Sequence, residues 1–179
     1  MKDLAEVSLE LLVNSLEAHA THVSFELSLG TLNRMVLRDN GKGMDKAMLK
    51  TITSPYSTSR QTRSLGFGLA FFKQAVEQAE GSIEIHSEVG KGTTVIGQWV
   101  SSHIDALPMG NLGETIALIL QRSPQCDLRF TLNQNQTTQT FNSRDVRDII
   151  APLTLDEPEI QRWIETSINS LFVNRKEIQ

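Results

Sequence analysis

The sequence predicts an α/β fold, because stretches with the spacing of amphipathic helices alternate with pairs of short strands. The first helix opens on Asp3 and Glu6, a capping pair placed three residues apart ahead of an apolar run. Glycine-containing turns separate the strands of each expected hairpin. The expected elements of this part of the chain are helices over 3–18, 45–52 and 70–79 and strands over 21–29, 34–38, 82–89 and 93–100.

Composition excludes several classes of function. The chain has 179 residues, is 39% hydrophobic and carries a formal charge of −4, which argues against a nucleic-acid-binding surface. No apolar segment is long enough for a membrane span, and Met1 leads directly into a helix without a signal peptide, so a cytoplasmic location is expected. The single cysteine, Cys126, cannot form an internal disulfide and is interpreted as a small buried hydrophobe.

The turn from Asp39 to Met44, Asp-Asn-Gly-Lys-Gly-Met, follows the apolar strand residues Met35 to Leu37. A carboxylate placed beside bare backbone can accept a hydrogen bond from an amino group such as that of adenine, and Gly41 and Gly43 let a flat ring approach. Taken alone, the pattern is also typical of an ordinary solvated turn.

Polar residues of the first helix form a second candidate. Glu10 and Asn14 stand four residues apart and therefore share a face, with Glu17 one turn further along. An Asn carboxamide oxygen suits Mg²⁺, and a Glu one turn away could orient or deprotonate a nucleophile. The alternative for each residue by itself is a solvated polar stripe.

The middle of the chain predicts a phosphate-binding loop. From Lys46 to Val76 there are five basic residues and no acidic one, and the polar stretch 53–64 contains Arg60 and Arg63. Such a loop is typical of lids that close over a ligand. Gly66 and Gly68 then open a helix whose free N–H groups could reach phosphate oxygens, although neither a Walker loop nor a Rossmann fingerprint is present.

Four motifs in register resemble the ATP-binding domain shared by gyrase, heat-shock chaperones, histidine kinases and mismatch-repair ATPases. Glu10 to Ala18 resembles its N box, Asp39 to Met44 its G1 box, Gly66 to Leu69 its G2 box and Gly90 to Thr94 its closing motif. The resemblance implies a two-layer α/β sandwich of the Bergerat type, with a mixed sheet covered on one face by helices. It departs from the kinase pattern at Ser64, where a further glycine is usual.

The resemblance also implies residue roles. Asn14 would hold Mg²⁺, Asp39 would bind the adenine amine, Thr94 would support Asp39, and Glu10 would be the catalytic base. Residues assigned to the nucleotide are Asn14, Asp39, Gly41, Gly43, Met44, Arg60, Arg63, Gly66, Gly68, Leu69 and Thr94.

The chain is predicted to divide into an ATP-binding domain (1–101), a linker (102–113) and a small α+β region (114–179). The last region should contain a helix, two strands and two further helices, with no catalytic constellation. Its final helix is expected to be capped by Asp156. The residues expected to be buried on it are Ile160, Trp163, Ile164, Ile168 and Leu171.

The expected function is that of a regulatory ATPase or protein kinase, histidine-kinase-like or anti-sigma-like, that uses Mg·ATP and acts on a protein partner or substrate. The phosphate acceptor of such a kinase would lie on another polypeptide, and a homodimer is possible. The alternative is a non-catalytic nucleotide-sensing module whose lid closure controls partner binding. The connector Ser-His-Ile-Asp at 102–105 and the later segment Pro-Leu-Thr-Leu-Asp-Glu-Pro-Glu-Ile at 152–160 carry a further resemblance. With them the whole chain resembles stand-alone ATP-binding proteins of fermentative anaerobes, often encoded near iron hydrogenases.

Overall fold

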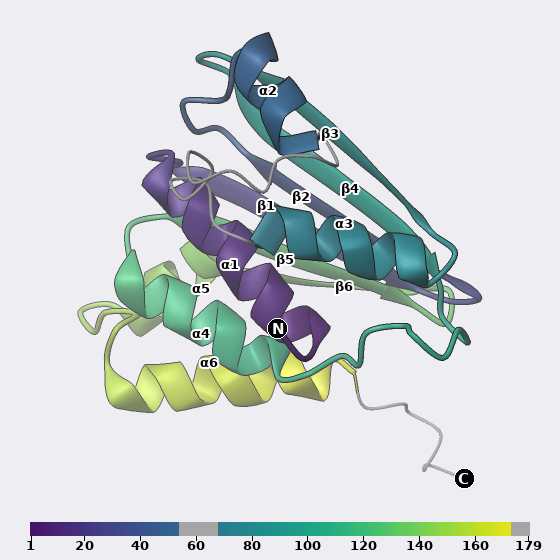
Figure 1. Cartoon of the computed structure of the whole chain (residues 1–179). Coiled ribbons are helices and arrows are strands. Elements are labelled where there is room, and N and C mark those ends of the chain that lie inside the picture. The colour runs from purple at the N-terminus through teal and green to yellow at the C-terminus, as the bar shows by residue number, and fades with distance from the viewer. Residues whose placement is uncertain (54–67, 173–179) are drawn as a thin grey trace, which may run out of the picture.

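The centre of the molecule is a six-stranded mixed sheet with the strand order β3-β4-β2-β1-β5-β6 (Figure 1). The computed structural model describes residues 1–53 and 68–172. Neighbouring strands are antiparallel except β1 and β5, which are parallel. The strands are β1 (His22–Leu29), β2 (Leu32–Asp39), β3 (Ser82–Glu88), β4 (Gly92–Val100), β5 (Asp127–Gln134) and β6 (Thr137–Asn142).

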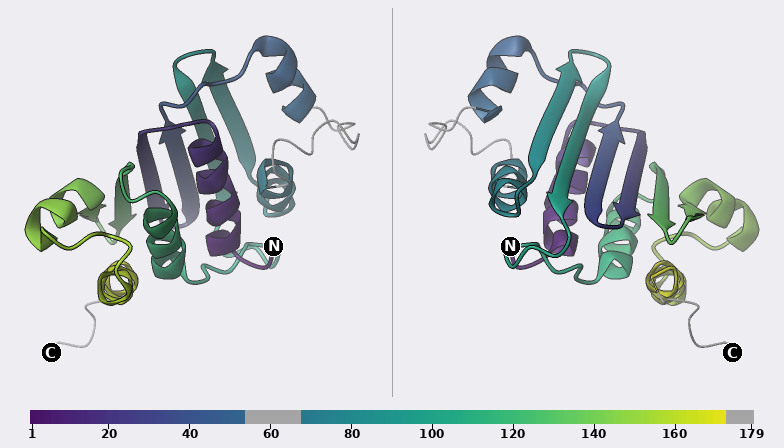
Figure 2. Two further views of the ribbon diagram at one scale, coloured as in Figure 1. Left: turned by 90° about the vertical axis from the view of Figure 1, so that its left-hand side faces the viewer. Right: turned by 90° about the vertical axis from the view of Figure 1, so that its right-hand side faces the viewer.

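Helices cover one face of this sheet, as the views along its edge show (Figure 2). Helices α1, α3 and α4 lie directly on the sheet, and α6 packs on α4. The predicted two-layer α/β sandwich with a mixed sheet is therefore confirmed. The helices are α1 (Leu4–Glu17), α2 (Lys46–Thr53), α3 (Gly68–Gln78), α4 (Leu112–Arg122), α5 (Ser143–Ile150) and α6 (Pro158–Ser170).

Helix α1 begins where the sequence predicts. Asp3 is the N-cap, and its Oδ1 accepts a hydrogen bond from the backbone N–H of Glu6 at 2.9 Å. The apolar stripe of the helix, which includes Leu4, Val7 and Leu12, is fully buried in the core. The opposite, more polar side of the helix remains available to a site.

The parallel pair β1–β5 joins the C-terminal region to the rest of the sheet. Phe25 and Phe130 are register partners on these strands, both are fully buried, and their ring centroids lie 5.2 Å apart. Parallel neighbours need a long crossover, and here it contains several other elements of the sandwich. The division at residues 101 and 113 stays a prediction, and the sheet itself runs across it.

Helix α6 differs from the prediction in two details. Its N-cap is Glu157, which makes no side-chain capping bond, rather than Asp156. Trp163 is 51% exposed, whereas its neighbour Ile164 and the next-turn residue Ile168 are fully buried. Each residue turns a helix by about 100°, so a side chain beside a buried position can point to solvent even when it is the largest apolar group on the helix.

Two predictions from composition can be compared with the structure. Cys126 is 1% exposed, and burial, with a smaller effect of Asp127, raises the pKa of its thiol to about 11. The thiol is therefore neutral near pH 7 and packs as a small apolar group, as predicted. Across residues 1–53 and 68–172, no helix combines the length and the apolar character needed to cross a bilayer.

Candidate nucleotide-binding site

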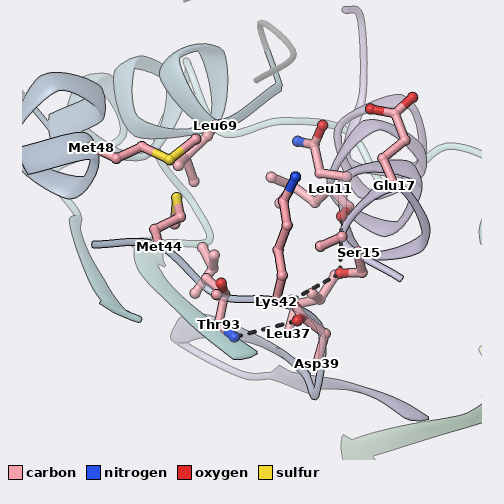
Figure 3. A pocket seen from close by; sticks show the side chains of 14 residues that line it. Leu11, Ser15, Glu17, Leu37, Asp39, Lys42, Met44, Met48, Leu69 and Thr93 are labelled. Carbon is pink, nitrogen blue, oxygen red and sulfur yellow. Dashed lines mark hydrogen bonds between the residues drawn. The ribbon is translucent and has the colours of Figure 1, made fainter. Parts of the chain in front are cut away.

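A pocket opens beside α1, above the end of β2 and the start of β4 and next to the starts of α2 and α3 (Figure 3). It holds about 790 Å³ of space, including the part open to solvent. Its walls are mostly apolar, and the polar groups converge from α1 and from the turn after β2. The lining residues are Leu11, Asn14, Ser15, Glu17, Ala18, Leu37, Asp39, Lys42, Gly43, Met44, Met48, Leu69, Thr93 and Val95.

Asp39 lies at the floor of this pocket with its carboxylate held by three donors. Oδ1 accepts from the backbone N–H groups of Gly41 at 2.8 Å and Thr93 at 3.3 Å, and Oδ2 accepts from Ser15 Oγ at 3.1 Å. A carboxylate oxygen can accept more than one hydrogen bond. Oδ2 therefore keeps the capacity for one further donor, and the carboxylate is oriented before any ligand arrives.

The glycines of the turn are explained by close backbone approaches. A Cβ at Gly41 would lie 2.7 Å from the carbonyl oxygen of Ala18, at the end of α1. Gly43 has φ +64°, and a Cβ there would collide with the carbonyl of Glu88, at the end of β3. Lys42, between them, donates its N–H to Ala18 O and accepts from Gly90 N, each at 2.8 Å. The turn is thus clamped between α1 and the β3–β4 hairpin.

Asn40 ties the same turn to the start of β1. Its Oδ1 accepts from the backbone N–H groups of Thr21 and His22, both at 2.9 Å, and its Nδ2 donates to Thr21 Oγ1 at 2.9 Å. The side chain replaces a stretch of backbone pairing where the antiparallel ladder of β1 and β2 ends. Asn40 therefore positions the turn that carries Asp39.

Helix α1 supplies one wall, with Asn14 reaching the pocket and Glu10 one turn towards its N-terminus. Glu10 is half-buried and does not line the pocket. It lies against the first residue of α3, Gly68, since a Cβ added to Gly68 would be only 2.6 Å from the Cβ of Glu10. One helical turn is about 5.4 Å, so Glu10 is next to the pocket and outside its present wall.

The structure brings together most of the predicted site residues that it describes. Asn14, Asp39, Gly43, Met44 and Leu69 line the pocket. Gly41 and Gly68 provide the close contacts described above. Three predicted phosphate-side residues, Arg60, Arg63 and Gly66, lie outside the described residues.

The support of Asp39 predicted for Thr94 comes instead from Thr93. In the β2–β4 register Asp39 is opposite Thr93, whereas Thr94 is opposite Arg38. Side chains alternate between the faces of a strand, so Thr93 lies on the pocket face with Val95, and Thr94 points to the other face. The prediction for Thr94 is wrong by one residue, and a shift of one residue along a strand moves a side chain to the opposite face of the sheet.

Several lining residues were not singled out in the sequence, notably Ser15, Lys42, Met48 and Thr93. Ser15 lies four residues after Leu11, so a serine within the apolar stripe of α1 was the available signal. Figure 3 shows the Lys42 side chain running across the pocket from the turn, with its ammonium group away from the Asp39 carboxylate. No periodicity in the sequence indicates that direction.

Comparison with known proteins agrees with this geometry. Residues 1–102 match the family model described as histidine kinase-, DNA gyrase B-, and HSP90-like ATPase. The chain belongs to this family, since the match covers more than half of it. It therefore contains an ATP-binding domain of the kind found in histidine kinases.

Individual relatives are kinases of which the chain covers a small part. Sporulation kinase D of Bacillus subtilis is 36% identical over 95 residues, which are 51% of this chain and 19% of that protein. The sensor histidine kinase ZraS of Escherichia coli is 33% identical over 94 residues, or 51% of this chain and 20% of ZraS. The chain thus matches about a fifth of the length of these relatives.

A solved structure extends the likeness of the fold beyond the family match. The N-terminal domain of a DNA repair protein superposes with a TM-score of 0.53 over 85% of this chain and 58% of that chain, at 16% identity. At this identity the comparison concerns the fold alone. It covers more of the chain than the family model does.

Proposed function

We propose that this chain binds Mg·ATP in the pocket beside α1, with the adenine amino group donating to Asp39 Oδ2. The observation that carries the proposal is the carboxylate fixed at the floor of an apolar pocket by Ser15, Gly41 and Thr93. Leu37, Met44 and Val95 supply apolar surface of the kind that an aromatic base contacts. A carboxylate selects an amino group over a carbonyl, so ATP should bind better than GTP.

Asn14 is the residue proposed to meet the metal. Magnesium in nucleotide sites is commonly held by one or two protein oxygens together with phosphate oxygens and water. The described residues contain no group of three His, Cys, Asp or Glu side chains that could hold a metal, and a single carboxamide oxygen on the pocket wall fits that pattern. When bound, Mg²⁺ would neutralise phosphate charge.

Glu10 is proposed to act as the general base. It sits one turn from Asn14 and beside the first residue of α3, on the side where the triphosphate would extend from Asp39 past Asn14. There its carboxylate could take the proton from a water or from the hydroxyl of a protein substrate. The chain would then serve as a regulatory ATPase or protein kinase, and in a histidine-kinase-like reaction the acceptor would belong to a partner protein.

Incubation with ATP carrying a radiolabelled γ-phosphate, with and without cell extract, tests this function. Released phosphate indicates hydrolysis, acid-stable label on protein indicates transfer to a hydroxyl, and acid-labile label indicates transfer to histidine. ATP binding without any of these outcomes would support the nucleotide-sensing alternative. Absence of ATP binding in calorimetry would contradict the proposal as a whole.

A further inference from the structure

Helices α1, α3 and α4 leave one face of the sheet uncovered (Figure 2). A second hollow lies on this open face, behind the floor of the nucleotide pocket. Its lining residues come from β1, β2 and β5, from the last residue of β6 and from the first turn of α5. It encloses about 840 Å³, including space open to solvent. The lining residues are His22, Val23, Ser24, Arg38, Asp39, Asp127, Arg129, Asn142 and Arg144.

The sheet register places the polar members of this hollow in one row. Ser24 of β1 is opposite Arg38 of β2 on one side and opposite Arg129 of β5 on the other, and Arg129 is opposite Asn142 of β6. Strands lie about 4.8 Å apart, so the two arginine backbones stand roughly 10 Å apart with the serine hydroxyl between them. Arg144, two residues after Asn142, adds a third guanidinium to the hollow.

These three arginines are exposed, and none has an ion-pair partner among residues 1–53 and 68–172. The acidic side chains nearby are already engaged. Asp127 pairs with Arg147 and lies 3.3 Å from His22 Nε2, and Glu26, the next outward residue of β1, accepts from Asn133. Two carboxylates, Asp39 and Asp127, also line the hollow, but Asp39 already accepts from three donors and Asp127 is paired with Arg147. The three arginines therefore leave an excess of positive charge in the hollow, in a chain of net charge −4, and such a charge attracts an anion.

We propose that this hollow, formed by Arg38, Arg129 and Arg144 with the Ser24 hydroxyl, is a binding site for a phosphate group. Guanidinium forks match the oxygens of a phosphate in bidentate geometry. A phosphate fits the site better than a carboxylate for two reasons. The two arginines and the hydroxyl offer more hydrogen-bond donors than the two oxygens of a carboxylate can accept, and three positive charges favour a ligand with two negative charges. The site is on the opposite face of the sheet from the nucleotide pocket and does not depend on ATP binding.

Titration of the isotopically labelled full chain with inorganic phosphate, followed by NMR, tests the proposal. The backbone amide signals of Ser24, Arg38 and Arg129 should shift in a saturable way, and sodium chloride at equal ionic strength should not reproduce the shifts. Signals of Leu37 and Val95, on the other face, report separately on any phosphate that enters the nucleotide pocket. Shifts that grow without saturation, or that chloride reproduces, would overturn the site.

Matched charge removals sharpen the test. Arg129→Gln and, independently, Arg144→Gln should each weaken phosphate binding at least about fivefold, because each removes a charge-assisted donor. Arg162→Gln, an exposed arginine on α6, removes the same charge away from the hollow and should leave the Kd within about twofold. Equal effects of all three variants would show general screening and reject the site.

A parallel titration identifies the source of the phosphate. A short peptide with a central phosphoserine is compared with inorganic phosphate and with the unphosphorylated peptide. Tighter binding of the phosphopeptide would assign the site to a phosphorylated side chain, and equal affinity would assign it to free phosphate. Equal binding of both peptides would contradict a phosphate site.

Discussion

Two neighbouring residues at the end of β2, Arg38 and Asp39, lie on opposite faces of the sheet and in different surroundings. Asp39 faces the helix-covered side, where one carboxylate is surrounded by apolar walls and held by three donors. Arg38 faces the open side, where three arginines gather around a serine. Beside apolar walls one oriented charge is enough to select a ligand, whereas on an open surface solvent screening weakens each charge and several are needed.

This difference follows from the alternation of side chains along a β-strand, which places neighbouring residues on opposite faces of the sheet. Leu37 therefore lines the nucleotide pocket, and Arg38 lines the hollow on the other face. Asp39, the last residue of β2, borders both hollows, and its carboxylate is held on the pocket side by Ser15. The same turn, held by Asn40 to Thr21 and His22, borders both hollows. The comparison can be tested by variants that should affect one face and not the other.

The largest effect is expected at Glu10. Glu10→Gln keeps the shape of the side chain but removes the base, so turnover or phosphotransfer should fall by about 10²–10⁴-fold while ATP affinity stays within about threefold. The control is Glu77→Gln on the exposed side of α3, which should change neither quantity. Normal turnover in Glu10→Gln would assign the proton transfer to another group, and an inactive wild type that binds ATP would favour sensing.

Substitutions at two neighbouring residues of β5 show how much each face of the sheet contributes to the free energy of unfolding. Phe130→Ala removes a fully buried ring that packs on Phe25 and should lower the free energy of unfolding by about 3–5 kcal/mol. Arg129→Gln, one residue away on the open face, should change it by less than about 0.5 kcal/mol. Urea denaturation followed by circular dichroism measures both. A comparable loss for Arg129→Gln would mean that the open face contributes to the core.

Asp39→Asn tests the floor of the nucleotide pocket. The amide would present a donor towards the adenine amine and would lose a charge-assisted hydrogen bond, so ATP affinity should fall by about ten- to a hundredfold, or roughly 1.5–3 kcal/mol. Glu26→Gln removes a charge from the other face of the same sheet and is the matched control. Calorimetry giving equal ATP affinity in Asp39→Asn and wild type would remove Asp39 from the site.

The smallest effect is expected at Ser15, one of the three donors to Asp39. Ser15→Ala should weaken ATP binding by about fivefold, the equivalent of roughly 1 kcal/mol for one hydrogen bond. Ser8→Ala is the control, because Ser8 is buried on the same helix but lies against Met35 and is not a lining residue of the pocket. An equal loss in both variants would indicate a general effect on α1 rather than on the carboxylate.

Local features of the site could be predicted from the chain alone. The two glycines of the Asp39 to Met44 turn indicate a backbone that other residues cannot follow without a clash. Asp3 caps the first helix and so fixes where α1 begins. A spacing of four residues puts Glu10 and Asn14 on one side of that helix. The alternation in β1 and β2 predicts the hairpin that delivers Asp39. The helix cap, the helical spacing and the hairpin depend on interactions between residues close in sequence, which short-range rules describe. The reason for the turn glycines is different, because they make room for Ala18 and Glu88, which are distant in sequence.

Contacts between distant segments were decided only by the tertiary structure. The register of β4 against β2 makes Thr93 rather than Thr94 the partner of Asp39, and a shift of one residue would have reversed both faces. Packing on α4 buries Ile164 and leaves Trp163 exposed, although both are apolar. The parallel pairing of β1 with β5 brings Arg129 beside Ser24, on the opposite side from Arg38. Such pairings depend on which strands become neighbours, and that choice is made by the burial of the whole core rather than by any local pattern.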